Sequence, residues 1–214
     1  MSRARAYFGE RGSALIEFLL CMALLIVPLL LGTAVLGLNL TREIQVTEVC
    51  RDATHMYSQG VDFTQTSYQT ELFKIAQGLN ITATGGNGVI ILSTISYVDD
   101  AECKAAFGSS YTTSQCPNYQ YTVFTRQVVI GSSNLRSSAW GTPPVDPTNS
   151  DNVTQTNQLT APSARALSGV NKFSLVTVNS STQFAYVGEV YFQTPDLSWW
   201  GPLGTTGISA RFVF

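Results

Sequence analysis

The chain has 214 residues and a formal net charge of −2, with 44% hydrophobic and only 12% charged residues. A protein that binds nucleic acid needs a basic face, and this balance argues against such a partner. Ordinary soluble domains contain about 25% charged residues. Much of the difference arises in the first 40 residues, and the chain beyond them is long enough to bury a core of its own.

Residues 19–38 form a run with almost no polar side chain. As a helix this run would be about 30 Å long, which matches the apolar thickness of a bilayer. Arg3, Arg5 and Arg11 precede it, so the positive-inside rule keeps the N-terminus in the cytoplasm and exports the C-terminal part. A secretory signal peptide is the competing interpretation, but its apolar region would span only about 7–15 residues. We therefore expect a retained membrane anchor.

Three residues should weaken the helix of this anchor. Pro28 has no N–H to donate to the carbonyl oxygen of Leu24, a loss that transmembrane helices tolerate. Gly32 and Gly37 follow within the same run. The sequence therefore predicts a kink or a loosened turn in this stretch.

A carboxylate lies close to the start of the apolar run. The segment from Arg11 to Phe18 reads RGSALIEF and places Glu17 four residues after Ser13. A charged side chain near the hydrocarbon is rare and usually paired or functional. If the chain were cut after Gly12, the new α-amine of Ser13 would lie one helical turn from Glu17, where opposite charges attract. In the alternative interpretation, Glu17 lies at the level of the lipid headgroups, where its charge costs little.

This junction and the run that follows it resemble the class III signal of type IV pilin-like proteins. More narrowly, they resemble TadE/TadF-like minor pilins (pseudopilins) of tight-adherence (Flp, type IVb) pilus systems. The resemblance implies that a prepilin peptidase cuts between Gly12 and Ser13. Glu17 and Phe18 then become the fifth and sixth mature residues and act in assembly. Major Flp pilins usually carry Tyr in place of Phe18, so Phe18 and the large exported domain favour a minor pilin.

The resemblance also implies a location and a set of partners. The protein would cross the inner (cytoplasmic) membrane once, with its N-terminus in the cytoplasm and its C-terminal domain in the periplasm or on an extracellular pilus. Its partners would be the prepilin peptidase, the other minor and major pilins, the inner-membrane platform and the assembly ATPase. It would be a structural protein for adhesion or biofilm formation, not an enzyme, and would need no cofactor.

The sequence predicts four segments: a leader (1–12), a transmembrane helix (13–40), an amphipathic stalk with a second helix (41–84) and a β-rich exported domain (85–214). The stalk continues the helix to about residue 58 because apolar side chains recur there with a helical period. These candidate buried residues are Val46, Val49, Cys50, Ala53 and Tyr57. Gly60 should end the helix.

A second helix is expected at residues 67–77, with Gly78 as its stop. It should bury the apolar side chains of Leu72, Phe73, Ile75 and Ala76.

The exported domain shows strand patterns separated by turns, at residues 89–98, 119–130, 173–178, 184–192 and 207–214. The apolar start of the first strand, residues 89–92, indicates a central position covered on both faces. With few helices between the strands, we expect a mostly antiparallel sheet behind the stalk helix, and so a pilin-like α+β fold. In the second strand, alternation should place Tyr121, Val123 and Val129 on one face and Phe124, Arg126 and Val128 on the other.

Two other parts of this domain have less regular patterns. Residues 131–168 are rich in Ser, Thr, Pro, Asn and Gly, so we expect a long loop without a sheet strand. The pair Trp199–Trp200 precedes a Gly-Pro turn. It is either an exposed contact for a subunit or ligand, or a buried lid on the sheet.

Four cysteines are present, and Cys103 and Cys116 both lie in the exported part. In an oxidising compartment they would form a disulfide, which contributes about 3 kcal/mol in the chain-entropy estimate. No metal site is expected, since no C-x-x-C pair or nearby His accompanies them. Cys21 and Cys50 lie too far apart on one helix to pair.

Two other functions compete with the pilin interpretation. A signal-anchored periplasmic or surface domain would bind glycan or protein without polymerising. A membrane-tethered hydrolase is disfavoured because the single histidine, His55, lies on the stalk without a recognisable catalytic partner. The mass of the mature chain distinguishes the two: loss of residues 1–12 would support the pilin, and an intact N-terminus would support the anchored binding domain.

Overall fold

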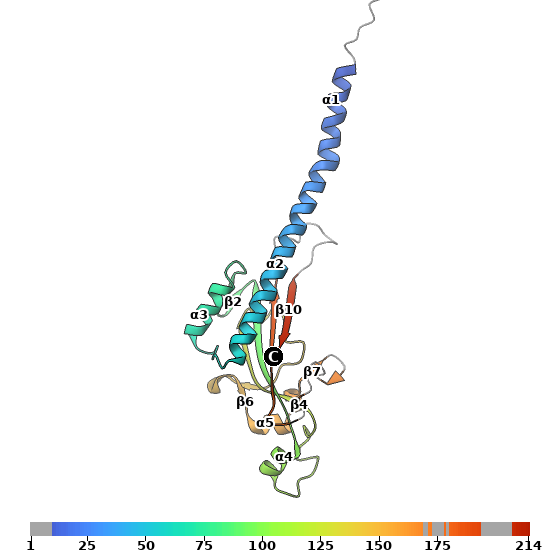
Figure 1. Cartoon of the computed structure of the whole chain (residues 1–214). Helices are drawn as coiled ribbons and strands as arrows, with labels where there is room; N and C mark the ends of the chain where they lie inside the picture. The colour runs from blue at the N-terminus through green and yellow to red at the C-terminus, as the bar shows by residue number, and fades with distance from the viewer. Residues whose placement is uncertain (1–9, 169–170, 173–177, 179, 194–206) are drawn as a thin grey trace, which may run out of the picture. The chain divides into compact units, whose positions relative to one another are not determined.

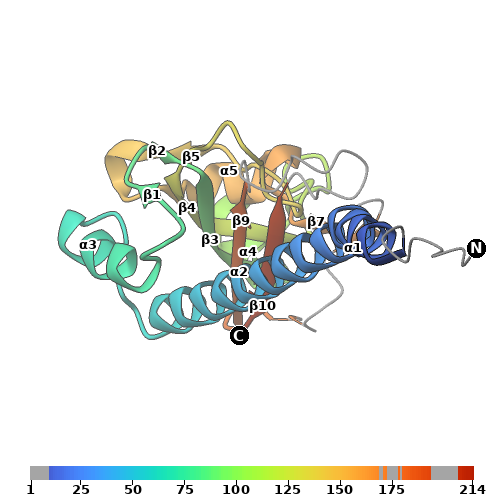
Figure 2. The same ribbon diagram turned by 90° about the horizontal axis from the view of Figure 1, so that it is seen from above.

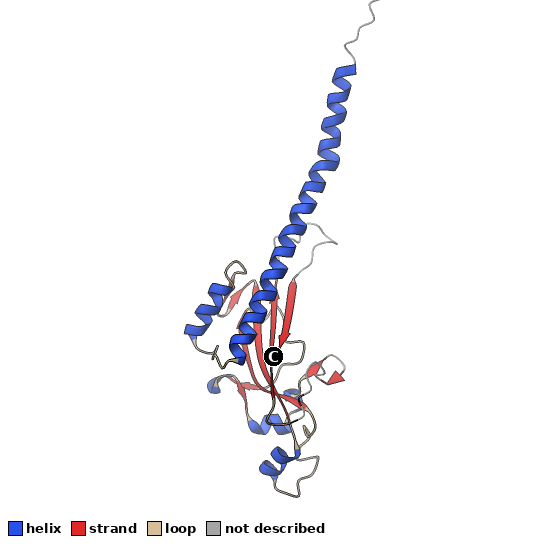
Figure 3. Ribbon diagram, in the orientation of Figure 1, coloured by secondary structure: helices blue, strands red, loops and turns tan. Residues whose placement is uncertain are grey.

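The computed structural model describes residues 10–168, 171–172, 178, 180–193 and 207–214. The chain divides into two units, Met1–Arg42 and Glu43–Phe214. Figure 1 follows the elements along the chain, and Figure 3 separates the helices from the strands. The first unit is helical where it is described, and the second contains the sheet, as expected for an α+β fold.

The N-terminal helix is nearly continuous. It consists of α1 (Glu10–Cys21), a π-helical segment (Met22–Ile26) and α2 (Val27–Ser58). The N–H of Val27 donates to the carbonyl oxygen of Met22, five residues back. Pro28, the next residue, has no N–H for the carbonyl of Leu24, and insertions of this kind accommodate such a defect. The expected loosening therefore occurs as a π turn before Pro28, whereas α2 runs on through Gly32 and Gly37.

Beyond Arg42, α2 becomes amphipathic as predicted. All five expected apolar residues are buried, and Thr54 joins them. They pack against side chains of the sheet, so the stalk helix covers one sheet face, as Figure 2 shows. The buried stalk residues are Val46, Val49, Cys50, Ala53 and Tyr57.

The second helix, α3, spans Thr66–Ile75. Leu72 and Ala76 are buried and Phe73 packs partly against the same core. The prediction for Ile75 is wrong, because its side chain is 43% exposed. Leu72 and Ala76 are one turn apart and set the buried face, and Ile75 lies on the side of that face away from Phe73.

The main sheet has six strands in the order β10-β9-β3-β4-β6-β5, and all recorded pairings are antiparallel. Three long strands were expected near their observed positions, as was β10. The central strand is β3, whose residues Val89, Ile90, Ile91 and Leu92 are all buried, as the apolar run predicted. The strands are β3 (Gly88–Tyr97), β4 (Thr122–Gly131), β5 (Val145–Asp146), β6 (Asn152–Val153), β9 (Phe184–Phe192) and β10 (Ile208–Val213).

A β-bulge changes the faces of β4. Thr94 pairs with Arg126 but Ile95 pairs with Phe124, so Thr125 is an extra residue on β4. Because one inserted residue reverses the alternation, Phe124 lies on the face opposite Val128. The prediction that Phe124 shares a face with Val128 is therefore wrong.

Each face of the sheet carries its own core. The core under α2 and α3 contains Ile90, Leu92 and Val190 from neighbouring strands. The opposite core is closed by the segment after β4, which supplies Trp140 and Val153. In Figure 2, α5 and β5 lie across the sheet from α2.

The expectation that residues 131–168 hold no sheet strand is wrong. Residues of β5 and β6 pair with each other, and Asn152 of β6 pairs with Arg126 of β4. Strands of two residues are too short for a visible alternation. The rest of the segment holds the 3-10 turns Pro147–Asn149 and Pro162–Ala164, helix α5 (Gln155–Thr160) and the start of a small hairpin of β7 (Leu167–Ser168) and β8 (Asn171–Lys172).

The described part of the second unit also contains a small hairpin and a further helix. A small hairpin pairs β1 (Ile81–Thr82) with β2 (Gly85–Gly86). Helix α4 (Asp100–Phe107) follows β3 and is capped by Asp99, whose side chain accepts a hydrogen bond from the N–H of Glu102. The sequence pattern did not predict this helix. The predicted strand at 173–178 falls almost wholly outside the described residues, and the Trp199–Trp200 pair lies outside them.

Candidate functional site

The four residues predicted for processing and assembly all fall within α1. Gly12 and Ser13 belong to this helix, whose first described residue is Glu10. Glu17 and Phe18 follow one turn later, and both side chains are exposed. Ser13 and Glu17 are four residues apart in a continuous helix, so the two positions share a face. A cut at Gly12–Ser13 would remove the first helical residues and leave Glu17 in the first turns of the new terminus.

The helix around Glu17 exposes an apolar surface. Phe18 is 59% exposed, and Leu24 reaches 75%. The helix Ala14–Ser58 contains a stretch long and apolar enough to cross a membrane, and none of that stretch is buried within the described chain. Glu17 is a carboxylate at the edge of a surface made otherwise of large apolar side chains. Such a group can form an ion pair where the apolar side chains contact lipid or other helices.

The predicted disulfide is present. Cys103, on α4, and Cys116 are bonded, with a Cα–Cα distance of 5.9 Å, and both are fully buried. Asp99, next to α4, links this part of the domain to the turn before β9, because its carboxylate accepts hydrogen bonds from the N–H and hydroxyl of Ser181. The hydroxyl of Ser181 contributes most to holding the pKa of Asp99 below its usual value.

The two remaining cysteines differ in environment. Cys21 is exposed on the N-terminal helix, whereas Cys50 is buried. Burial raises the pKa of Cys50 to about 12, and its thiol donates to the carbonyl oxygen of Gly188. A thiol that stays protonated is a poor nucleophile and a poor metal ligand. Cys50 therefore serves packing between α2 and β9.

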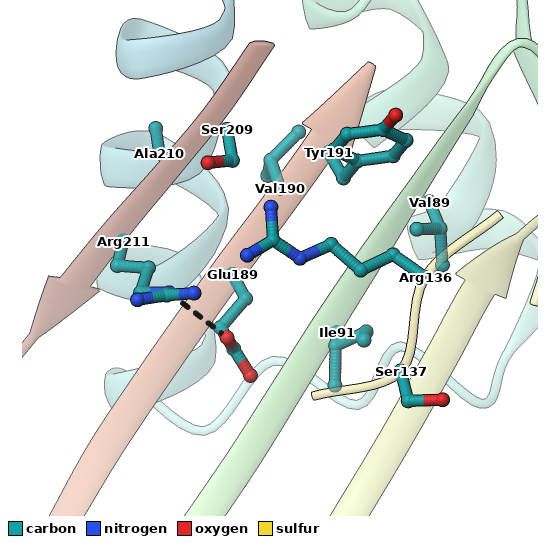
Figure 4. Close-up of a pocket in the computed structure, with 10 residues that line it drawn as sticks. All are labelled: Val89, Ile91, Arg136, Ser137, Glu189, Val190, Tyr191, Ser209, Ala210 and Arg211. Atoms are coloured by element: carbon teal, nitrogen blue, oxygen red, sulfur yellow. Dashed lines mark hydrogen bonds and ion pairs between the residues drawn. The ribbon is translucent and has the colours of Figure 1, made fainter. Parts of the chain in front are cut away.

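A polar cluster on the sheet face that points away from α2 was not predicted. Glu189 of β9 is only 7% exposed, and its carboxylate accepts from the N–H of Ala139, the hydroxyl of Ser138 and Nε of Arg211. Figure 4 shows Glu189 beside Arg211 of β10, with Arg136 lying over the same face. The only sequence signal was a charged residue in the middle of an otherwise apolar strand.

The hollow beside this cluster is too small for a ligand. Its volume is about 10 Å³, which is about the space of a single water molecule. Arg136 lies over the ring of Tyr191, 5.4 Å from its centroid. The cluster therefore attaches the segment after β4 to the sheet, and we assign it a structural role.

His55 offers no constellation for catalysis in the described part of the chain. Its ring is exposed and lies edge-on to Phe214, with centroids 5.7 Å apart. Among the described residues, no group of three or more His, Cys, Asp or Glu side chains could hold a metal ion.

Comparison of the chain with protein-family models, with curated proteins and with solved structures found no match.

Proposed function

We propose that this chain is a minor pilin of the TadE/TadF-like kind, a structural subunit of a type IVb (Flp/Tad) pilus. The N-terminal helix would insert in the inner membrane, and a prepilin peptidase would cut between Gly12 and Ser13. The mature chain would then join a pilus base or tip complex through its apolar helix. One observation carries the proposal: an exposed carboxylate, Glu17, lies one helical turn after Ser13 at the start of an exposed, membrane-length apolar helix.

The charge pairing follows from this geometry. Cleavage would create a cationic α-amine on Ser13, and Glu17 would carry a negative charge on the same face of the helix. In an apolar environment the attraction between such charges is much stronger than in water. Two copies side by side, or one copy beside another pilin, could exchange these partners. The pairing would thus fix the axial position of one helix against the next.

The first experiment measures the mass of the mature chain, which shows the residue at which it begins. Protein recovered from cells that carry the pilus genes should begin at Ser13. We expect Gly12→Ala to slow the cut and a larger residue at this position to block it, since the peptidase needs close approach to the backbone. Native protein that begins at Met1, or well beyond the apolar helix, would overturn the proposal.

The second experiment separates cutting from assembly. Glu17→Val should be cut normally but reach the sheared pilus fraction at one tenth of the normal level or less, because the new amine then lacks its partner (about 1.4 kcal/mol per factor of ten). Glu43→Val is the matched control, since Glu43 is exposed on the same helix beyond the apolar run. Normal incorporation of the Glu17→Val protein would contradict the charge-pairing account.

A second candidate function is a signal-anchored binding domain that does not polymerise. The unit Glu43–Phe214 favours it in one respect, because this unit has its own cores on both faces of the sheet. An uncut N-terminus, together with absence of the protein from purified pili, would support this alternative.

A further inference from the structure

A hollow of about 260 Å³ opens beside the C-terminal end of α2, within the unit Glu43–Phe214. Residues of β3 and β4, the start of β9 and the short strand β6 line it together with α2 and the turn after α2. A cavity of about 150 Å³ is enough to hold benzene. This hollow therefore has room for one six-membered ring with its substituents.

Aromatic side chains form one wall of the hollow. Phe184 and Tyr186 are two residues apart on β9, so their side chains point to the same face of the sheet. Phe184 is 51% exposed, and Tyr186 packs edge-on against the buried Tyr57, with ring centroids 5.8 Å apart. Tyr57 therefore holds the ring of Tyr186 in place, while about half of the Phe184 side chain remains open to a ligand. A ring face of this kind suits a ligand with an apolar side of its own.

The cation in the hollow is already neutralised. Arg126 forms an ion pair with Asp62, and its Nε donates to the carbonyl oxygen of Ser150 at 2.8 Å. Burial alone would raise the pKa of Asp62, but hydrogen bonds from Arg126 and Thr64 outweigh burial and hold it below its usual value. Asp62 is thus ionised at neutral pH. With this pair in place, the hollow gives little preference to a phosphate or a carboxylate.

The remaining polar lining is uncharged and can accept hydrogen bonds. The hydroxyl of Thr125, the bulged residue of β4, donates to the carbonyl oxygen of Thr94 at 3.2 Å, which leaves its oxygen as an acceptor. Asn152 donates through its amide nitrogen to the carbonyl oxygen of Asn149, which leaves its amide oxygen as an acceptor. The ligand that fits should therefore offer hydroxyl or amide donors around a ring.

We propose that this hollow binds one neutral pyranose ring, a hexose or an N-acetylhexosamine at the end of a glycan. The C–H face of the sugar would stack on Phe184, and its hydroxyl groups would meet Thr125 and Asn152. A purely apolar side chain from a protein partner fits less well, because it would cover these polar groups without pairing them, and an unpaired buried polar group weakens binding.

This inference goes beyond the proposed function and does not rest on it. A pilin subunit and an anchored receptor could each carry such a site. Failure of sugar binding would leave the cut at Gly12 and the role of Glu17 untouched, and failure of those would leave the sugar site untouched.

The test uses the full-length protein in a detergent without a sugar headgroup, such as an amine oxide, since a maltoside detergent would compete. Saturation-transfer NMR would be recorded with the methyl glycosides of glucose, galactose, mannose and N-acetylglucosamine. We expect binding of at least one glycoside, with the strongest transfer to its ring C–H protons. Binding should weaken about tenfold or more in Phe184→Ala and persist in Phe184→Trp, which keeps an aromatic face.

Tyr68→Ala is the matched control, because Tyr68 is an exposed aromatic residue on α3 that does not line the hollow. It should bind the glycoside like the unchanged protein, and near-ultraviolet circular dichroism would show that each variant is folded. Absence of binding by all four glycosides would overturn the proposal, as would equal binding by Phe184→Ala. Binding of p-cresol without any glycoside would overturn it too, and would assign the hollow to an aromatic side chain of a protein partner.

Discussion

The two units of this chain use the same apolar residues in opposite ways. Leu24 in the first unit is 75% exposed, whereas Leu92 in the second is 0% exposed. The described part of the first unit is helical and forms most of its backbone hydrogen bonds internally, but it leaves most of its side chains uncovered. The second unit buries its apolar side chains within its own fold. The first unit therefore needs an apolar environment from outside the chain, and the second does not.

The largest difference between the two units is expected when a leucine of each is replaced by alanine. Leu92→Ala should lower the free energy of unfolding of the second unit by about 2–5 kcal/mol, because it leaves a cavity in a closed core. Leu24→Ala should leave that free energy unchanged. Urea unfolding of the full-length protein in mild detergent, followed by near-ultraviolet circular dichroism, measures both. Similar effects of the two substitutions would break the comparison.

The cysteines provide a second matched pair. Replacing Cys103 and Cys116 together by Ser should lower the free energy of unfolding by about 3 kcal/mol, since the unfolded chain regains the freedom of the closed loop. Cys21→Ser, in the exposed helix, should have no effect on the second unit. The same urea experiment with and without a reducing agent is the check. An unfolding curve of the unchanged protein that does not respond to reduction would contradict this role for the bond.

A smaller effect is expected from one added methyl group. In Gly188→Ala the new Cβ would overlap the hydroxyl of Thr54 and lie 2.9 Å from its Cβ, so we expect a loss of about 1–3 kcal/mol. Gly32→Ala adds the same group in open space and should change nothing in the second unit. Combining Gly188→Ala with Thr54→Ala should recover part of the loss. A Gly188→Ala protein as stable as the original would show that α2 shifts freely on β9.

Much of the fold could be predicted where a pattern repeats over several turns or residues. The stalk stripe was visible because Val46, Cys50 and Ala53 recur with the period of a helix, and all are buried. The range of β9 matches the predicted 184–192 because turn residues precede it and aromatic and β-branched residues fill it. The disulfide was predicted because Cys103 and Cys116 both lie in the part of the chain that we expect to be exported to an oxidising compartment.

The failures share a physical cause: local patterns do not record which segment packs against which. The extra residue Thr125 reverses which side chains of β4 share a face, but Thr is an ordinary strand residue. The sequence therefore gave no sign of the bulge. Asn152 joins the main sheet because Arg126 of β4 lies beside it in the fold, 26 positions away in the chain. Glu189 and the hollow beside Phe184 both depend on residues far apart in the chain, and their geometry could not be read from spacing.

The position of β3 in the middle of the sheet has a consequence for how the molecule is made. Val89 pairs with Gly131 on one side and with Tyr191 on the other. At a synthesis rate of about 5–20 residues per second, the partner on the second side is produced about 5–20 seconds after β3 itself. After β4 has paired with β3, the apolar strand β3 keeps one unpaired edge until β9 is made. Another nascent copy of the chain could pair with that edge. Ribosome pausing ahead of residue 184 would prolong the exposure, because β9 is the strand that covers the second edge of β3 in the folded domain.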